Sequence, residues 1–233
     1  MLNSFLLNKS QLFEYLKVII SSSDHIADYF SNKNKIEVFD KSGSKSATIH
    51  LPWVLPPFEG KNELLKFISH WDKAEFNSII ILIQAGRSAL AHCSSGGILE
   101  HKLIRKYMVR KKQGKAQITY LNQKGKSRAG SRIRLNQTVQ FFEDINDQVN
   151  LWMKEQNPQR ILISCPPRLW GLLFQSKVKP VFSKKDARVF KIPLDINIPD
   201  RQELMRVHKL SQKIIFETDR LNPDMLDKIS NGY

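Results

Sequence analysis

The chain has 233 residues, of which 41% are hydrophobic and 25% are charged, a composition that is typical of a folded globular protein and excludes a disordered one. The formal net charge of +15 indicates a polyanionic partner, because Lys and Arg side chains release counterions when they bind a phosphate backbone. The two cysteines lack the spacing of a zinc site or a disulfide framework, and no apolar stretch is long enough for a signal peptide or a membrane span, so we expect a cytoplasmic protein.

The first 74 residues predict an appended α+β segment. Leucine and isoleucine recur at helical spacing near the start, and two short apolar runs flank a turn rich in serine. Prolines then remove backbone donors and restrain the residues before them. We expect, in order, a helix over 10–20, a hairpin of strands 36–39 and 47–51, an extended connector over 51–57 and a helix that begins at Asn62.

Residues 75–220 predict an α/β domain whose mixed sheet is flanked by helices, and residues 221–233 are expected to form a tail. The run 78–83 is almost entirely isoleucine and leucine, as in a strand that is buried on both faces. Apolar and aromatic side chains at a spacing of three or four mark the longest helix. The expected elements are strands 78–83, 89–93 and 98–109, a helix over 131–154, a strand over 160–164, a short helix that ends at 174, a strand over 189–192 and a closing helix over 200–217.

The positive charge is concentrated in one segment. Between His101 and Phe142 there are twelve Lys or Arg residues and no Asp or Glu. Glycines interrupt this segment and predict an irregular loop over 110–130, between the third strand and the long helix. A solvated basic loop is the commoner explanation of such a segment, but the local excess of charge also fits a surface that binds nucleic acid.

The standard catalytic and nucleotide-binding motifs are absent from the sequence. Gly125-Lys126-Ser127 matches the end of a phosphate-binding P-loop, but Tyr120 stands where that motif requires its first glycine. No HExxH, GxSxG or GxGxxG occurs, so we expect no metal and no cofactor. The amide of Gln117 remains as a group that orients a water or hydroxyl nucleophile, and nearby cations would neutralise charge that develops in a transition state.

The segment around this glutamine resembles a known family. The run Tyr107-x-x-Arg110-Lys111-Lys112-Gln113-Gly114-x-x-Gln117 is followed by Lys124-Gly125-Lys126-Ser127-Arg128 and a long helix, and it is preceded by a strand-turn-strand around Gly86. This pattern looks like the release-factor-like domain of the ribosome quality-control factors that cleave peptidyl-tRNA. The resemblance covers 78–155, extends to about 215, and implies the RNase H-like mixed sheet of the central domain of eukaryotic-type class I release factors.

By this resemblance, Gln117 would be the catalytic glutamine and Gly114 the first residue of a GxxQ motif. Tyr107 and Arg110 would support the 3′ end of the tRNA. The remaining RNA-binding residues are expected to be cations of the loop and of the start of the long helix, namely Lys111, Lys112, Lys115, Lys124, Lys126, Arg128 and Arg132. The chain departs from release factors in that Lys115 and Ala116 stand between Gly114 and Gln117, in place of a compact Gly-Gly-Gln.

The resemblance further implies the release of stalled nascent chains from peptidyl-tRNA on the large ribosomal subunit. We expect the protein to be a monomer. It leaves open whether the peptidyl ester or a tRNA phosphodiester near the CCA end is cut. A non-catalytic ribosome- or tRNA-binding module is the alternative function. A third possibility, a metal-dependent nuclease, would need clustered carboxylates that the basic segment lacks.

His92 and His101 are candidate acid–base groups, although a structural role is commoner for histidines in strands.

Overall fold

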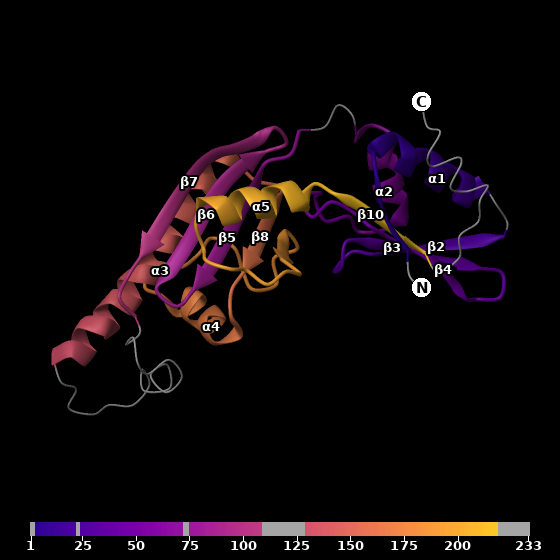
Figure 1. Ribbon diagram of the computed structural model, residues 1–233. Helices are drawn as coiled ribbons and strands as arrows, with labels where there is room; N and C mark the ends of the chain where they lie inside the picture. Colours follow the sequence, from indigo (N-terminus) through magenta and orange to yellow (C-terminus); the bar gives the residue numbers. More distant parts are fainter. Residues whose placement is uncertain (1–2, 22–23, 72–74, 109–128, 219–233) are drawn as a thin grey trace. The chain divides into compact units, whose positions relative to one another are not determined.

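The computed structural model describes residues 3–21, 24–71, 75–108 and 129–218, apart from the side chains of 129–132 (Figure 1). The chain forms two compact units. One contains the first 75 residues together with the chain from Lys209 onward, and the other contains Phe76–His208. Within the described ranges, no helix is long and apolar enough to span a membrane.

The first unit is built on a five-stranded antiparallel sheet in the order β1-β10-β4-β3-β2. Its elements are β1 (Asn3–Leu7), α1 (Lys9–Ser21), β2 (His25–Phe30), β3 (Lys35–Asp40), β4 (Lys45–His50), α2 (Lys61–Ile68) and β10 (Ile214–Thr218). The expected hairpin is confirmed as β3 and β4. In its turn the Asp40 carboxylate accepts hydrogen bonds from the backbone N–H groups of Ser42 and Ser44, at 2.9 and 3.0 Å.

One face of this sheet forms the core of the first unit. Phe216, Ile49 and Ile36 are neighbours across β10, β4 and β3, and all three are buried. Helix α1 packs on this face, where Tyr15 meets Phe216 edge-on with the ring centroids 5.0 Å apart. The helix expected over 10–20 is confirmed as α1, and its buried stripe joins it to the sheet.

The C-terminal part of the described chain corrects two expectations. The sequence predicts one helix over 200–217, but helix α5 (Arg201–Ser211) ends early and Ile214–Thr218 form β10. Because β10 pairs with β1 and β4, the chain from Lys209 belongs to the first unit and not to a domain that ends at 220. Buried and half-buried residues alternate along β10, as they do in a strand with one face in a core. Strands β1 and β2 also lie where the sequence pattern predicts no strand.

The second unit is built on a mixed five-stranded sheet in the order β7-β6-β5-β8-β9. Its strands and helices are β5 (Ser78–Gln84), β6 (Arg87–Ser94), β7 (Gly97–Arg105), α3 (Ala129–Gln156), β8 (Arg160–Ser164), α4 (Pro167–Gln175), β9 (Val189–Lys191) and most of α5. β5, β6 and β7 form an antiparallel meander, and β8 and β9 extend the sheet parallel to β5. The predicted mixed α/β fold is therefore confirmed.

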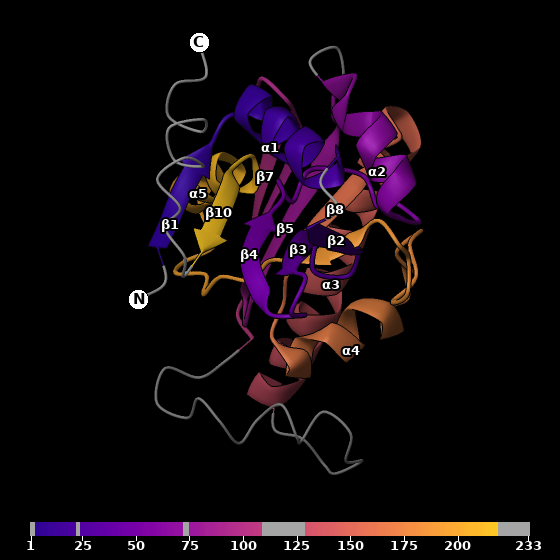
Figure 2. The same ribbon diagram turned by 90° about the vertical axis from the view of Figure 1, so that its right-hand side faces the viewer.

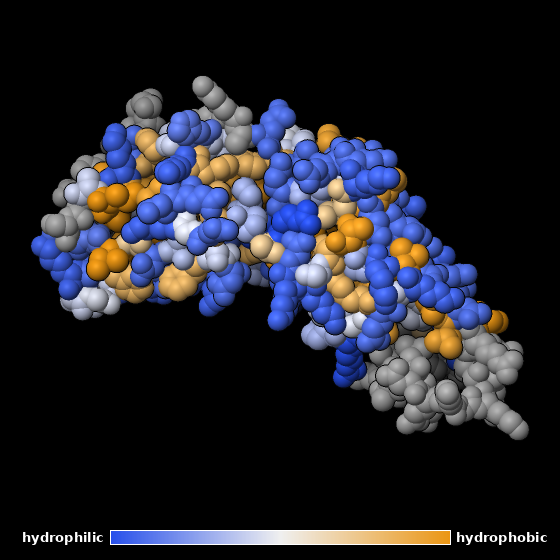
Figure 3. Space-filling model, turned by 180° about the vertical axis from the view of Figure 1, so that it is seen from behind, coloured by the Kyte–Doolittle hydropathy of each residue, from blue (hydrophilic) through white to orange (hydrophobic). Residues whose placement is uncertain are grey.

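Helices cover both faces of this sheet (Figures 1 and 2). α3 and α4 pack on one face, where Phe142 and Trp152 of α3 share a core with Ile79 and Ile81 of β5. α5 lies on the opposite face. The central strand β5 is buried over nearly its whole length, as its isoleucine-rich sequence predicts. Seen from behind, the surface of this unit is mainly hydrophilic, with scattered apolar side chains (Figure 3).

Candidate nucleic-acid interface

One edge of the second sheet collects the ends of four strands. β5, β8 and β9 are parallel, and β7 has the same direction because β6 is antiparallel to both β5 and β7. The carboxyl ends of these four strands therefore lie at the same edge, which we call the carboxyl edge. The chain leaves this edge after Met108, and the basic segment 109–128 leads from there to Ala129 at the start of α3. Ligands of open α/β sheets commonly bind at such an edge.

The tight turn between β5 and β6 contacts residues 106–108, which directly precede the basic segment and which we call its root. Lys106 donates a backbone hydrogen bond of 3.0 Å to the carbonyl oxygen of Gly86, and the N–H of Gly86 points to the sulfur of Met108 at 3.1 Å. Gly86 has a φ of 76°, and a Cβ atom at this position would lie 2.5 Å from the carbonyl oxygen of Lys106. Only glycine fits this turn without displacing the strand that enters the basic segment.

Helix α3 fixes the same root from the other side. The backbone N–H of Tyr107 donates a 2.6 Å hydrogen bond to Oε1 of Gln137. One residue earlier, Nζ of Lys106 forms an ion pair of 2.9 Å with Oδ2 of Asp144. Gln137 and Asp144 lie seven residues apart, two helical turns, and so project from one side of α3. The chain therefore enters the basic segment from a fixed position.

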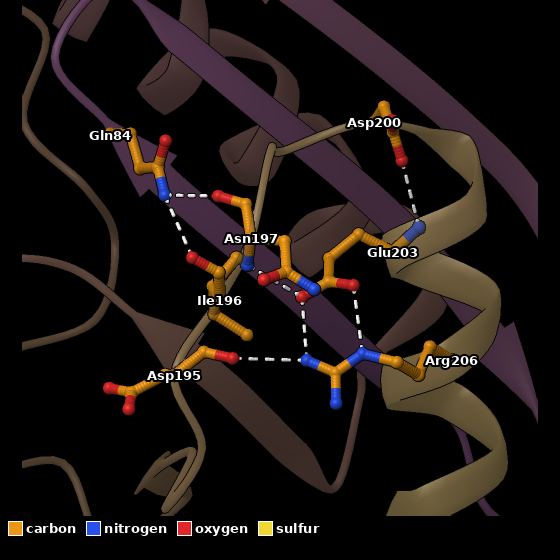
Figure 4. Close-up of polar contacts among 7 residues, drawn as sticks. All are labelled: Gln84, Asp195, Ile196, Asn197, Asp200, Glu203 and Arg206. Carbon is orange, nitrogen blue, oxygen red and sulfur yellow. Dashed lines mark hydrogen bonds and ion pairs between the residues drawn. The ribbon is translucent and has the colours of Figure 1, made fainter.

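The segment that precedes α5 supports the turn at Gly86 (Figure 4). The side-chain amide of Gln84 donates to the carbonyl oxygens of Ile196, at 2.9 Å, and of Asn197. These bonds attach the end of β5 to the chain at 195–197. Gln84 is paired with Arg87 across the turn, so the contact lies next to the first residue of β6.

An ion pair in α5 makes this support rigid. Glu203 is 5% exposed, and its carboxylate accepts bonds from Nε and Nη2 of Arg206, at 2.8 and 2.7 Å, and from the N–H of Asn197, at 3.0 Å. Asp200 caps the helix by accepting the N–H of Glu203 at 2.8 Å. The hydrogen bond from Arg206 holds the pKa of the Glu203 carboxyl below its usual value of 4.5. The carboxylate is therefore charged and fully engaged at neutral pH.

Most of the predicted site residues lie outside the described residues. They are Gln117, Gly114, Arg110, Lys111, Lys112, Lys115, Lys124, Lys126 and Arg128, together with the side chain of Arg132, whose backbone belongs to α3. Tyr107 is described, and its side chain is 50% exposed beside the start of the basic segment. An exposed tyrosine at this place is available to stack on a base or ribose.

The two histidines lie along the strands, away from the carboxyl edge. His92 is 2% exposed near the far end of β6, where its ring lies 6.4 Å from that of Trp152. Burial lowers the pKa of His92, while the charge of Glu100 acts in the opposite direction. His101 is exposed on β7, four residues before the strand ends at Arg105. The structure thus favours a structural role for His92 and places neither histidine at the root of the basic segment.

Among the residues that hold the chain in place just before the basic segment, only Gly86 can be recognised from the sequence alone. A glycine between two strands predicts the turn, and the structure adds the reason that the turn must be so tight. Gln137 and Gln84 have no such signal, because each acts on a backbone group that is distant in the sequence. Only the tertiary structure brings them to the carboxyl edge.

The sequence model of a family described as "Bacteroidetes VLRF1 release factor" (bVLRF1) matches residues 78–218, more than half of the chain. The chain belongs to this family. The bVLRF1 match begins with β5 and ends with β10, so it contains the second sheet, the basic segment and the strand that completes the sheet of the first unit. The resemblance to release-factor-like quality-control domains is thereby confirmed.

Curated relatives of this bVLRF1 chain bear the name tRNA endonuclease ANKZF1. The human protein is 31% identical over 146 residues, which make up 60% of this chain and 20% of the relative. The cattle protein is 29% identical over 154 residues, 64% of this chain and 21% of the relative. This chain thus spans about a fifth of the length of these relatives. A solved structure, the Vms1 mitochondrial localization core, is similar over 89% of this chain and 95% of that one, with a TM-score of 0.49 and 15% identity.

Proposed function

We propose that this bVLRF1 protein cleaves peptidyl-tRNA on stalled ribosomes or large ribosomal subunits and so frees the nascent chain. The observation that carries the proposal is that the family match includes the basic segment with Gln117, which begins at the carboxyl edge of the second sheet. The family is described as a release factor, and the relatives are named tRNA endonucleases. Both descriptions fit a reaction that breaks a bond at the end of a tRNA.

Gln117 is the proposed catalytic residue, and Gly114 is the proposed first position of its GxxQ motif. A neutral amide is a weak base, so its role is to orient the attacking oxygen rather than to remove a proton. If the bond is the peptidyl ester, a water oxygen attacks the carbonyl carbon and the bond to the 3′ oxygen of the tRNA breaks. The peptide then leaves with a carboxyl group, and the tRNA regains its 3′ hydroxyl.

The basic segment is the proposed RNA-binding part of the site. Arg110 and Tyr107 are proposed to hold the 3′ end of the tRNA, because both lie in the motif that precedes Gln117. The other cations neutralise phosphates along the backbone and contribute affinity that is independent of base sequence. They are Lys111, Lys112, Lys115, Lys124, Lys126, Arg128 and Arg132.

The test is nascent-chain release from purified large subunits that carry peptidyl-tRNA. We expect the wild-type protein to release the chain, Gln117→Leu to lose release and retain binding, and Gln123→Leu, a second glutamine of the same segment, to behave as wild type. Equal release by the Gln117 variant would contradict the catalytic assignment. Binding without release by the wild-type protein would instead support a non-catalytic tRNA-binding module.

The 3′ end of the tRNA product identifies the bond. A tRNA that still ends in CCA indicates ester hydrolysis, whereas a shortened tRNA indicates cleavage of a phosphodiester. Because both products come from the same reaction mixture, one sequencing experiment on wild-type product separates the two chemistries.

A further inference from the structure

We propose that Arg87 and Arg105 form a phosphate-binding pair that holds the acceptor arm of the tRNA beside the basic segment. The RNA-binding role of the pair stands on its own geometry, and the identity of that RNA as tRNA rests on the proposed function. Neither arginine belongs to the motif around Gln117, and Arg87 lies in a different strand.

The two arginines face each other across neighbouring strands. Arg87 is the first residue of β6, Arg105 is the last residue of β7, and they are direct partners in the antiparallel register. Direct partners project from the same face of a sheet, with their Cβ atoms about 5 Å apart. Both side chains are exposed. Like charges in this arrangement repel each other, so the pair is unfavourable for the free protein.

Nothing in the described part of the chain neutralises this pair. Neither guanidinium has an ion-pair partner among the described residues. Glu203 and Asp200 at the start of α5 are engaged elsewhere, since Glu203 binds Arg206 and Asp200 caps the helix. The exposed carboxylate of Asp195, in the segment that precedes α5, forms no ion pair with either arginine. The basic segment that follows Met108 contains no Asp or Glu. A bound phosphate would supply the missing negative charge, and arginine suits it because the guanidinium donates two parallel hydrogen bonds.

The position of the pair selects the acceptor arm as its ligand. Arg105 and the exposed Tyr107 are separated by one residue, so the pair lies directly beside the root of the basic segment. From Arg105 to Gln117 the chain advances twelve residues, which span at most about 40 Å when extended. An RNA end that reaches Gln117 therefore lies within this distance of the pair, and the part of a tRNA next to its 3′ end is the acceptor arm.

The experiment measures binding of deacylated tRNA by fluorescence anisotropy between 50 and 200 mM salt, a range over which phosphate contacts change affinity by orders of magnitude. All chains also carry Gln117→Leu, so that cleavage does not consume the probe. The test variant is Arg87→Gln with Arg105→Gln. The control is Lys177→Gln with Lys185→Gln, which removes two exposed cations from the loop that precedes β9, toward the opposite end of the parallel strands.

We expect the double arginine variant to bind tRNA about tenfold more weakly for each arginine removed, as for charge-assisted hydrogen bonds. The slope of the logarithm of affinity against that of salt should fall by roughly one for each lost contact. The thermal midpoint should stay equal or rise, because a repulsive pair is removed, whereas a structural role predicts a lower midpoint. The control should keep the slope of the parent chain, which carries Gln117→Leu alone.

An unchanged affinity and slope in the arginine variant would overturn the inference, even if the wild-type protein cleaves peptidyl-tRNA. Loss of binding to vesicles that contain phosphatidylserine, with tRNA binding intact, would assign the pair to lipid and also overturn it. If the wild-type protein cleaves nothing but the pair still determines tRNA affinity, the inference stands and the proposed function fails.

Discussion

The backbone N–H of Tyr107 and the side chain of Gln137 are joined by a 2.6 Å hydrogen bond, although 30 residues separate them in the sequence. The bond connects the last described residues before the basic segment with the helix that follows that segment. Both ends of the segment that holds Gln117 are therefore attached to helix α3. The first end is attached by this hydrogen bond, and the second end continues directly into the helix at Ala129. The consequences for activity and stability can be measured separately.

Replacement of Gln137 by leucine should reduce nascent-chain release by about 10- to 100-fold, because a misplacement of about 1 Å at a reacting group has effects of this size. Stability should change by only about 1 kcal/mol, the typical value of one hydrogen bond. Gln140→Leu is the matched control, since Gln140 is an exposed residue of the same helix. Wild-type release by the Gln137 variant would show that this bond does not position the segment.

The glycine turn gives a second prediction, for which the first unit supplies a control. Gly86 and Gly43 share a φ of 76°, but a Cβ atom at Gly43 would meet nothing within 4 Å. Gly43→Ala should therefore cost about 1 kcal/mol for the backbone conformation alone. Gly86→Ala should cost several kcal/mol, because the new methyl group displaces Lys106 as well. Chemical denaturation measures both values, and equal costs would contradict the steric explanation.

The Glu203–Arg206 pair predicts a dependence of stability on acid. The folded-state pKa of Glu203 is lowered, so its contribution is fully present above the usual value of 4.5 and is lost as the pH falls through the folded-state pKa. Glu203→Gln should lower the free energy of unfolding by about 1–3 kcal/mol at pH 7. It should also reduce the loss of stability that the wild-type protein shows as the pH falls below 4.5. Glu155→Gln, at an exposed carboxylate near the end of α3, should leave this loss of stability unchanged. The measurement is the free energy of unfolding between pH 3 and 7.

His92 predicts a separate change between pH 7 and 5. Burial lowers its folded-state pKa below 6.5, so the unfolded chain binds the extra proton and stability falls as the pH drops below that value. His92→Leu should reduce the slope of stability against pH in this window. A residual slope of the same sign is expected from His208, whose pKa is also lowered by burial. His101→Gln, which changes an exposed histidine, should keep the wild-type slope, and an unchanged slope in His92→Leu would contradict the assignment.

The sequence by itself determined the features that depend on local pattern. The isoleucine run of β5 and the apolar stripe of α3 predict their own secondary structure, since a buried element repeats its apolar side chains with its own period. The clustering of cations between His101 and Phe142, and the motif around Gln117, are also properties of the linear chain. These features were sufficient to predict the mixed fold and the release-factor-like family.

Only the tertiary structure decided which distant groups meet. Ile214–Thr218 become a strand because β1 and β4 offer them backbone partners, a fact that the helical spacing of the preceding residues conceals. In the same way, the turn at Gly86 and the opposed pair of Arg87 and Arg105 acquire their roles from strand register, and the amide of Gln137 acquires its role from the packing of α3 beside Tyr107. Hydrogen bonding across a sheet depends on which strands become neighbours, and the periodicity of a single strand does not contain that information.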